Sequence, residues 1–168
     1  MSFRSFVIRF IPFLILLIFL KGFFSEVLSL RYFDLFSAVA LALVPHLKLN
    51  LWAFVSLFLL GLLRSYEGIY PYYFFGLLYV LLFGLWHYAR RYFKEERRFF
   101  RLLYWSLGLF VLLFSELLFF FQRLALHNLN YTFWLTLLLK TLLYGIICLI
   151  LIHAVYFIIT RVFEYEVQ

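Results

Sequence analysis

The chain has 168 residues, of which 67% are hydrophobic and only 14% are charged. A soluble domain has an apolar share of about one half, so this composition excludes an ordinary water-soluble fold and predicts a protein that lies within a lipid bilayer. The net charge of +7 would suggest nucleic-acid binding in a soluble protein. In a membrane protein the placement of the cations reflects topology instead, so we expect no nucleic-acid partner.

Apolar runs long enough to cross a bilayer, about 20 residues for about 30 Å, recur along the whole sequence. The polar stretches between them are too short to fold separately. We therefore predict an all-α, polytopic membrane protein with one integral membrane domain covering residues 1–168. The domain is a six-transmembrane-helix bundle, with helices at about residues 6–24, 30–45, 49–63, 70–89, 102–121 and 134–160.

The first apolar run follows Arg4 and Arg9, which resembles the start of a signal peptide. No small-residue cleavage site follows it, so we expect a retained transmembrane helix. The second run stops at Pro45 and is short, and it either spans the membrane or forms a re-entrant pair with the third. Within it, Ala38 and Ala42 form a small-xxx-small pair, which suits close helix packing or a partner face.

The fourth and fifth runs are separated by the strongly charged segment RRYFKEERRFFR. We predict a cytoplasmic basic loop that orients the helices, with the cations Arg90, Arg91, Lys94, Arg97, Arg98 and Arg101. With the N-terminus inside and six crossings, ten cations lie at cytoplasmic ends, these six together with Arg4, Arg9, Lys48 and Arg161. The outer ends hold four, Lys21, Arg31, Arg64 and Arg123. This bias predicts that both termini are cytoplasmic.

Two charges lie inside the last two predicted helices. Glu116 is five residues before Phe121, and Lys140 is six residues after Trp134. Each is therefore roughly 7 to 9 Å inside the outer end of its helix at 1.5 Å per residue. Because an unpaired charge at that depth is unfavourable, we predict an intramembrane ion pair between Glu116 and Lys140. The pair fixes helix packing, or it belongs to a substrate or proton path.

Other residues that carry chemistry are sparse. His46, His87, His127 and His153 have no second ligand at metal spacing on their own helices, so we expect no metal site and no cofactor. His153 is a packed or loop-facing residue, or a proton-relay group. The sequence contains no Gly-rich phosphate loop, nucleophile elbow or HExxH pattern, so we expect no enzymatic activity.

Several short patterns resemble one bacterial family. The second predicted helix opens at Asp34-Leu35, and the third ends in Gly61-Leu62-Leu63 with Gly68 just beyond it. The fourth is rich in Leu and aromatic residues and closes on a basic cluster over residues 84–91. With its size and near absence of loops, the chain resembles the rod shape-determining protein MreD family. It differs from that family at Phe33, where Pro is usual, and at Arg64-Ser65, where an Asp is usual.

The resemblance implies a non-enzymatic membrane scaffold of the bacterial rod (cell-elongation) complex, in the cytoplasmic membrane. Its expected partners are the bitopic protein MreC and, directly or through it, the MreB filament and RodA with its transpeptidase. The resemblance also implies a fold like the substrate-binding subunits of energy-coupling-factor transporters. The alternative function is therefore a vitamin-binding subunit of such a transporter, with Glu116, Lys140 and Arg64 as ligand contacts.

Overall fold

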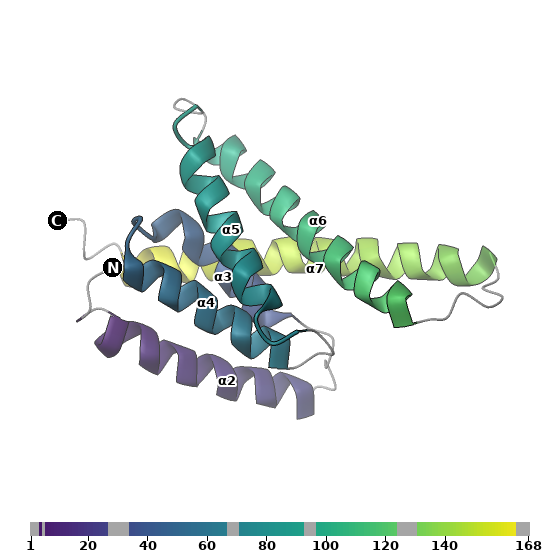
Figure 1. Ribbon diagram of the computed structural model, residues 1–168, viewed down its shortest axis with the longest axis horizontal. Helices are drawn as coiled ribbons and strands as arrows, with labels where there is room; N and C mark the ends of the chain where they lie inside the picture. The colour runs from purple at the N-terminus through teal and green to yellow at the C-terminus, as the bar shows by residue number, and fades with distance from the viewer. Residues whose placement is uncertain are drawn as a thin grey trace.

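The computed structural model is all-helical in the part of the chain that it describes, which is residue 4 and residues 6–26, 34–66, 71–92, 97–123 and 131–163. No strand occurs among these residues. Figure 1 shows the order of the elements along the chain. They are the π-helix η1 (Phe6–Phe10), α2 (Ile11–Glu26), α3 (Leu35–Leu43), the 3-10 helix η2 (Val44–His46), α4 (Leu51–Tyr66), α5 (Phe74–Ala89), α6 (Arg97–Arg123) and α7 (Tyr131–Phe163).

Three of the helical stretches are long and apolar enough to cross a membrane: Phe6–Phe23, Phe99–Leu118 and Leu138–Arg161. Three shorter apolar helices accompany them, at Leu35–His46, Leu51–Tyr66 and Phe74–Ala89. The structure thus has the helical character of a membrane protein that its composition predicts. It separates three long helices from three short ones, of which only the second predicted helix was expected to be short.

Predicted helix starts are wrong by about five residues at two helices and by four at a third, α5, which begins at Phe74 and not at 70. The second helix begins at Leu35 and not near residue 30, because Asp34 is its N-cap. The backbone of Asp34 is not helical, with φ of −83° and ψ of 78°. Its carboxylate accepts a hydrogen bond from the N–H of Ser37 at 2.9 Å. The fifth helix begins at Arg97 and not near 102, so part of the predicted basic loop is helical. Charged residues in a first turn do not stop a helix that continues into an apolar stretch.

Helix α3 lies at the centre of the bundle. It packs against α7, α4, α6 and α2, and every one of its side chains is buried. Ala38 is 1% exposed and Ala42 is 0% exposed. The pair of Ala38 and Ala42 therefore allows close helix packing within this chain, which is the first of the two interpretations given for it. The other interpretation, a partner face, is wrong because the neighbouring helices already cover both residues.

The end of α3 is stabilised by a side chain from α6. In a regular helix the carbonyl of Leu41 would accept from the N–H of residue 45, but Pro45 has no N–H. The indole Nε1–H of Trp105 donates to this carbonyl instead, at 3.1 Å. Since Trp105 is itself almost fully buried, the bond satisfies two buried polar groups at once.

Helices α4 and α5 approach most closely at two glycines. A methyl group on Gly61 would collide with the backbone of Gly76, and one on Gly76 would lie 2.8 Å from a ring carbon of Phe58. Glycine is needed here to allow backbone contact between the helices. The Gly-Leu-Leu run of the sequence thus marks a packing contact.

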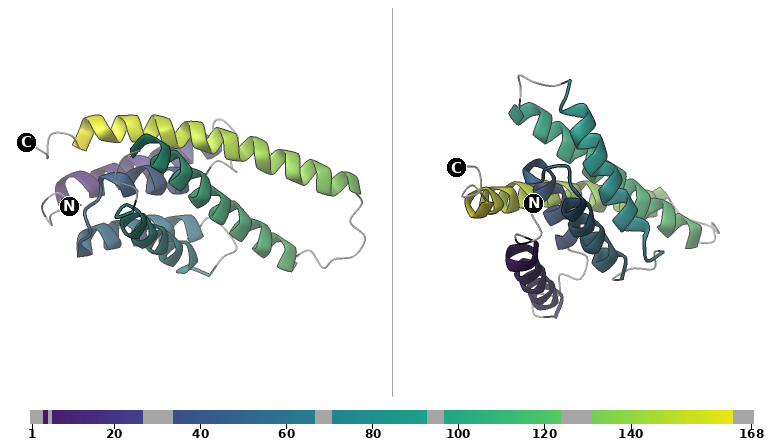
Figure 2. Two further views of the ribbon diagram at one scale, coloured as in Figure 1. Left: turned by 90° about the horizontal axis from the view of Figure 1, so that it is seen from above. Right: turned by 60° about the vertical axis from the view of Figure 1, so that its left-hand side comes forward.

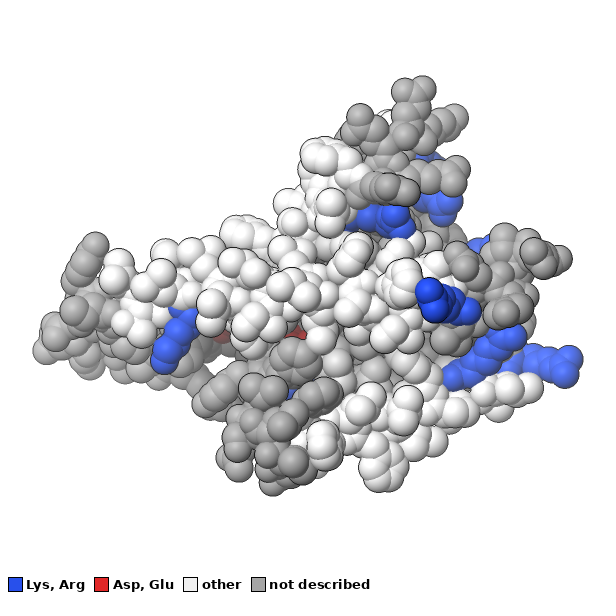
Figure 3. Space-filling model, turned by 180° about the vertical axis from the view of Figure 1, so that it is seen from behind, with Lys and Arg blue, Asp and Glu red and all other residues white. Residues whose placement is uncertain are grey.

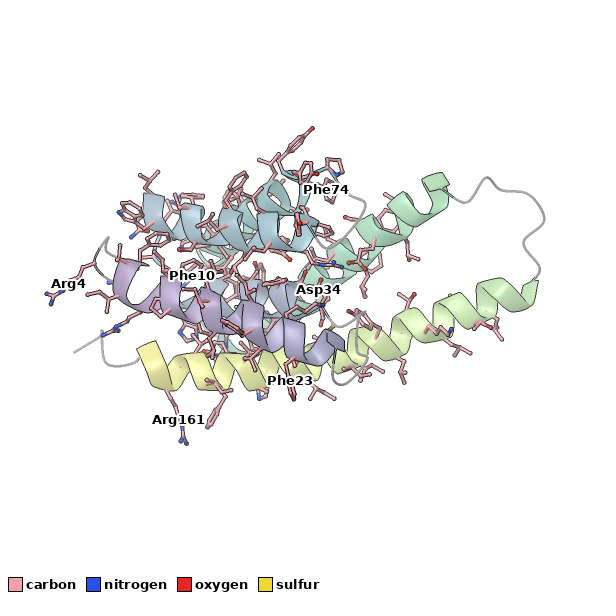
Figure 4. The ribbon with its side chains drawn as sticks, turned by 90° about the horizontal axis from the view of Figure 1, so that it is seen from below. Arg4, Phe10, Phe23, Asp34, Phe74 and Arg161 are labelled. Carbon is pink, nitrogen blue, oxygen red and sulfur yellow. The ribbon has the colours of Figure 1, made fainter. Side chains whose placement is uncertain are left out.

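The two ends of the described chain lie on the same side of the molecule. Arg4 and Arg161 are at one end of the bundle, whereas Asp34 and Phe74 lie toward the other (Figure 4). Most of the described Lys and Arg side chains visible from behind gather at the end that contains Arg4 and Arg161 (Figure 3). At the opposite end, α6 and α7 diverge from each other (Figures 1 and 2).

Candidate functional site

A cluster of buried charges joins three helices. Arg64, in the last turn of α4, places its Nε 2.9 Å from Oδ2 of Asp34 at the start of α3. The Nη2 of the same guanidinium donates to Oε1 of Glu116 on α6. The side chains of Arg64, Asp34 and Glu116 are 13%, 7% and 25% exposed. One planar guanidinium thus binds two carboxylates, a geometry that lysine could not provide.

Hydrogen bonds extend this cluster to α7 and α5. The backbone N–H of Asp34 donates to the hydroxyl of Tyr144 on α7 at 2.7 Å. The hydroxyls of Ser37 on α3 and Tyr79 on α5 share a hydrogen bond. Polar groups in lipid must be satisfied within the protein. We define the polar cluster as Asp34, Arg64 and Glu116 with Ser37, Tyr79 and Tyr144.

A further cation lies beside the polar cluster. Lys21 of α2 is 7% exposed and interacts electrostatically with Glu116. Among the described side chains, the charges at this level are therefore two negative, Asp34 and Glu116, and two positive, Arg64 and Lys21. Their sum is zero, which lowers the cost of holding ionised groups away from water.

The predicted pair between Glu116 and Lys140 is wrong, because Glu116 binds Arg64 and Lys140 is exposed. The two helices do meet where the sequence placed them: a methyl group on Gly145 would lie 3.5 Å from a methyl carbon of Leu113. Lys140 is five residues before Gly145, and at 100° per residue it points about 140° away from the face that meets α6. Contact between the two helices therefore does not bring Lys140 to Glu116, because the direction of a side chain around the helix decides its partner.

The sequence contained the signal for the actual partner. Asp34 opens the second predicted helix and Arg64 closes the third, and both were assigned to the same side of the membrane as Glu116. What the sequence could not show is which helices are neighbours. The acidic position of the family resemblance and the Arg64 by which this chain departs from it proved to be bonded to each other.

A second group of polar and aromatic side chains lies at the end of the bundle that contains Arg161. Arg101 donates to the hydroxyl of Tyr156, and its guanidinium carbon is 4.7 Å from the centre of the same ring. The His46 ring stacks on the ring of Tyr156, with the two ring centres 4.7 Å apart. The Nε2 of His46 is 3.4 Å from the hydroxyl oxygen of Thr160. These contacts hold η2, α6 and α7 together. His153 is exposed, and its ring lies edge-on to the ring of Trp105, with the two ring centres 6.1 Å apart.

The basic residues of the predicted cytoplasmic loop have different positions. Arg90 and Arg91 are exposed in the turn after α5, and Arg101 is half-buried against Tyr156. Lys94 and the side chains of Arg97 and Arg98 lie outside the described residues. Arg101 is therefore a packing residue of α6 and not a loop cation.

What these groups can do chemically follows from their pairing. Both carboxylates of the polar cluster bind the same guanidinium, so the cluster is arranged to hold helices together. Within the described ranges, no group of three or more His, Cys, Asp or Glu side chains could hold a metal ion. The fold and the cluster define a helical membrane protein with an internally neutralised charge network. No protein-family model, curated protein or solved structure matches the chain.

Proposed function

We propose that this protein is a non-enzymatic membrane scaffold of the MreD type, which binds an MreC-like bitopic protein and helps to organise peptidoglycan synthesis in a bacterial rod complex. In this proposal the six-helix bundle lies in the cytoplasmic membrane, α3 either spans it or forms a re-entrant pair with α4, and both termini are cytoplasmic. The fold would then be akin to the substrate-binding subunits of energy-coupling-factor transporters.

One observation carries the proposal: residues that give the family resemblance are structural residues of a single region. Asp34 caps α3 and binds Arg64, which directly follows the Gly61-Leu62-Leu63 run. Gly61 in turn forms the close contact between α4 and α5. Positions that resemble a family and that also meet in space support the resemblance more strongly than separate sequence matches would.

The chemistry of the polar cluster favours a scaffold over an enzyme. Its carboxylates bind Arg64, and its hydroxyls bind other polar groups of the cluster. Such a network specifies how helices pack. Placement of Arg4 and Arg161 at the same end supports an even number of crossings, which six spans would give. The gathering of basic residues at that end supports its assignment to the cytoplasm.

The proposal is tested by purification from the native host in a mild detergent. A tagged copy of the chain is isolated, co-purifying MreC-like protein is quantified, and bound small molecules are identified by native mass spectrometry. An unrelated tagged multispan protein from the same membranes serves as the control. We expect the MreC-like protein in near-stoichiometric amount with this chain alone. A bound vitamin without any MreC-like protein would overturn the proposal in favour of a transporter subunit.

Depletion of the chain in growing cells gives an independent readout. A scaffold of the rod complex is needed for elongation, so depleted cells should become round, and normal shape should return when the chain is expressed again. Cells that keep their shape but require an external vitamin would support the transporter alternative.

A further inference from the structure

The N-terminal part of α7 projects from the bundle. Helix α7 has 33 residues, which is about 50 Å at 1.5 Å per residue, against about 30 Å for the hydrocarbon layer. Its N-terminal end diverges from α6 in both Figure 1 and Figure 4. We define the arm as residues 131–143 of α7. Every described side chain of the arm except Thr141 is exposed.

A continuous exposed row follows one face of α7 from the arm into the bundle. Its members are separated by alternating steps of four and three residues, and all are exposed: Thr136, Lys140, Leu143, Ile147, Ile150 and Ala154. We call this row the α7 seam. Steps of four and three bring residues to the same side of a helix and form the pattern by which a second helix packs lengthwise against it. The seam lies away from the face that packs against α3 and α6.

Lys140 is the one charged member of the α7 seam. Among the described residues no hydrogen bond or ion pair involves it, whereas the charges of Asp34, Glu116, Arg64 and Lys21 already balance one another. Lys140 lies one helical turn from Tyr144, which binds Asp34. Acidic atoms are visible beside the arm from behind (Figure 3). Within the described ranges, therefore, the positive charge of Lys140 remains to be matched.

We propose that the α7 seam is the docking surface for the single transmembrane helix of a bitopic partner, and that a carboxylate on this helix pairs with Lys140. The proposal rests on the proposed function for the class of partner. A lipid tail would cover Leu143, Ile147 and Ile150 of the seam but would offer no fixed charge to Lys140. A membrane helix with an acidic residue matches both the apolar row and the cation, and one charge at a seam position sets the register of the two helices.

The surface is tested by photo-crosslinking in cells. The crosslinking residue p-benzoylphenylalanine replaces Leu143 in the seam or, as a matched control, Leu81, which is 58% exposed on α5. The probe is the MreC-like protein of the same host, and adducts are mapped by mass spectrometry. We expect adducts with its transmembrane helix from position 143 that are at least tenfold more abundant than those from position 81.

The charge is tested by substitution of Lys140. Because Lys140 is exposed, Lys140→Glu should leave the elution profile in detergent unchanged while lowering co-purified partner at least tenfold. Lys140→Arg should retain the partner. Exchange of the partner's acidic residue for lysine should restore binding to Lys140→Glu.

The outcomes separate this inference from the proposed function. If the MreC-like protein co-purifies equally with Lys140→Glu and crosslinks at position 81, the docking surface is wrong and the proposed function stands. If no MreC-like protein is bound, the proposed function fails. In that case the adducts formed from position 143 decide the docking surface. If only lipids are crosslinked there, the docking surface is wrong. A different single-helix protein supports it only if Lys140→Glu removes the adduct and the reciprocal charge exchange restores it.

Discussion

Removal of the cation from the polar cluster tests most directly what holds the bundle together. Arg64→Met keeps the length of the side chain but leaves the carboxylates of Asp34 and Glu116 without their shared guanidinium. Breaking a buried ion pair by removing one partner costs about 3–5 kcal/mol, because a charge remains buried without compensation. Glu116 is 25% exposed and Lys21 remains nearby, so we expect the lower end of this range, about 3 kcal/mol of unfolding free energy.

The measurement is reversible unfolding in mixed detergent micelles, titrated with SDS and followed by tryptophan fluorescence. Arg161→Met is the matched control, since Arg161 is exposed and, among the described residues, its guanidinium carbon lies 4.7 Å from the centre of the Phe157 ring. An exposed contact of this kind contributes about 0.5–1 kcal/mol. The difference between the two arginine variants isolates the effect of burial and pairing.

A neutral triple variant then separates charge from packing. Asp34→Asn, Arg64→Met and Glu116→Gln together remove all three charges, and the Asn amide oxygen can still cap α3. Uncharged groups of similar volume often replace a buried ion network at little cost, so the triple variant should be clearly more stable than Arg64→Met alone. Two results would refute the reasoning: Arg64→Met within about 1 kcal/mol of the unchanged protein, or a triple variant no more stable than the single one.

Two further substitutions test the contacts around α3 and α4. Trp105→Phe should lower the unfolding free energy by about 1–3 kcal/mol more than Trp86→Phe, since Trp105 donates to the carbonyl of Leu41, whereas Trp86 Nε1 is buried with no hydrogen bond to any described group. Equal losses in the same SDS titration would contradict this. Gly61→Ala should destabilise by about 1–3 kcal/mol through its collision with the α5 backbone, whereas Gly84→Ala, where a methyl group meets open space, should be neutral or slightly stabilising. Similar midpoints for the two alanine variants would show that the glycine contact is unimportant.

The sequence predicted the all-helical membrane character because hydrophobicity is a local property. Each apolar run corresponds to a helix, and Pro45 does end the regular part of α3. The predicted topology also placed Arg64 and Glu116 near the same, outer side of the membrane. The start of α3 was misplaced because the residues before Asp34 are apolar enough to continue a helix, while a cap is defined by backbone geometry and one hydrogen bond.

The pairing of charges could not be predicted for a different reason. Glu116 has two cations at similar depth, Arg64 and Lys140, and depth alone does not distinguish them. The choice depends on rotation about the helix axis and on which helices are neighbours, and both are set by packing across the whole bundle. In the structure α3 packs against both α4 and α7, and Arg64 reaches Glu116 while Lys140 is exposed.

The polar cluster also explains how a short helix can occupy the centre of a membrane protein. Helix α3 has nine residues, about 14 Å, and its first and last residues, Leu35 and Leu43, are both buried, so its end groups are shielded from solvent. At its start the carboxylate and the N–H of Asp34 bind Ser37 and Tyr144, and near its end the Leu41 carbonyl binds Trp105. Two of these three partners come from the long helices α7 and α6. Because the long helices satisfy the ends of the short one, α3 requires them for its stability, and loss of either contact should weaken the packing of the whole bundle.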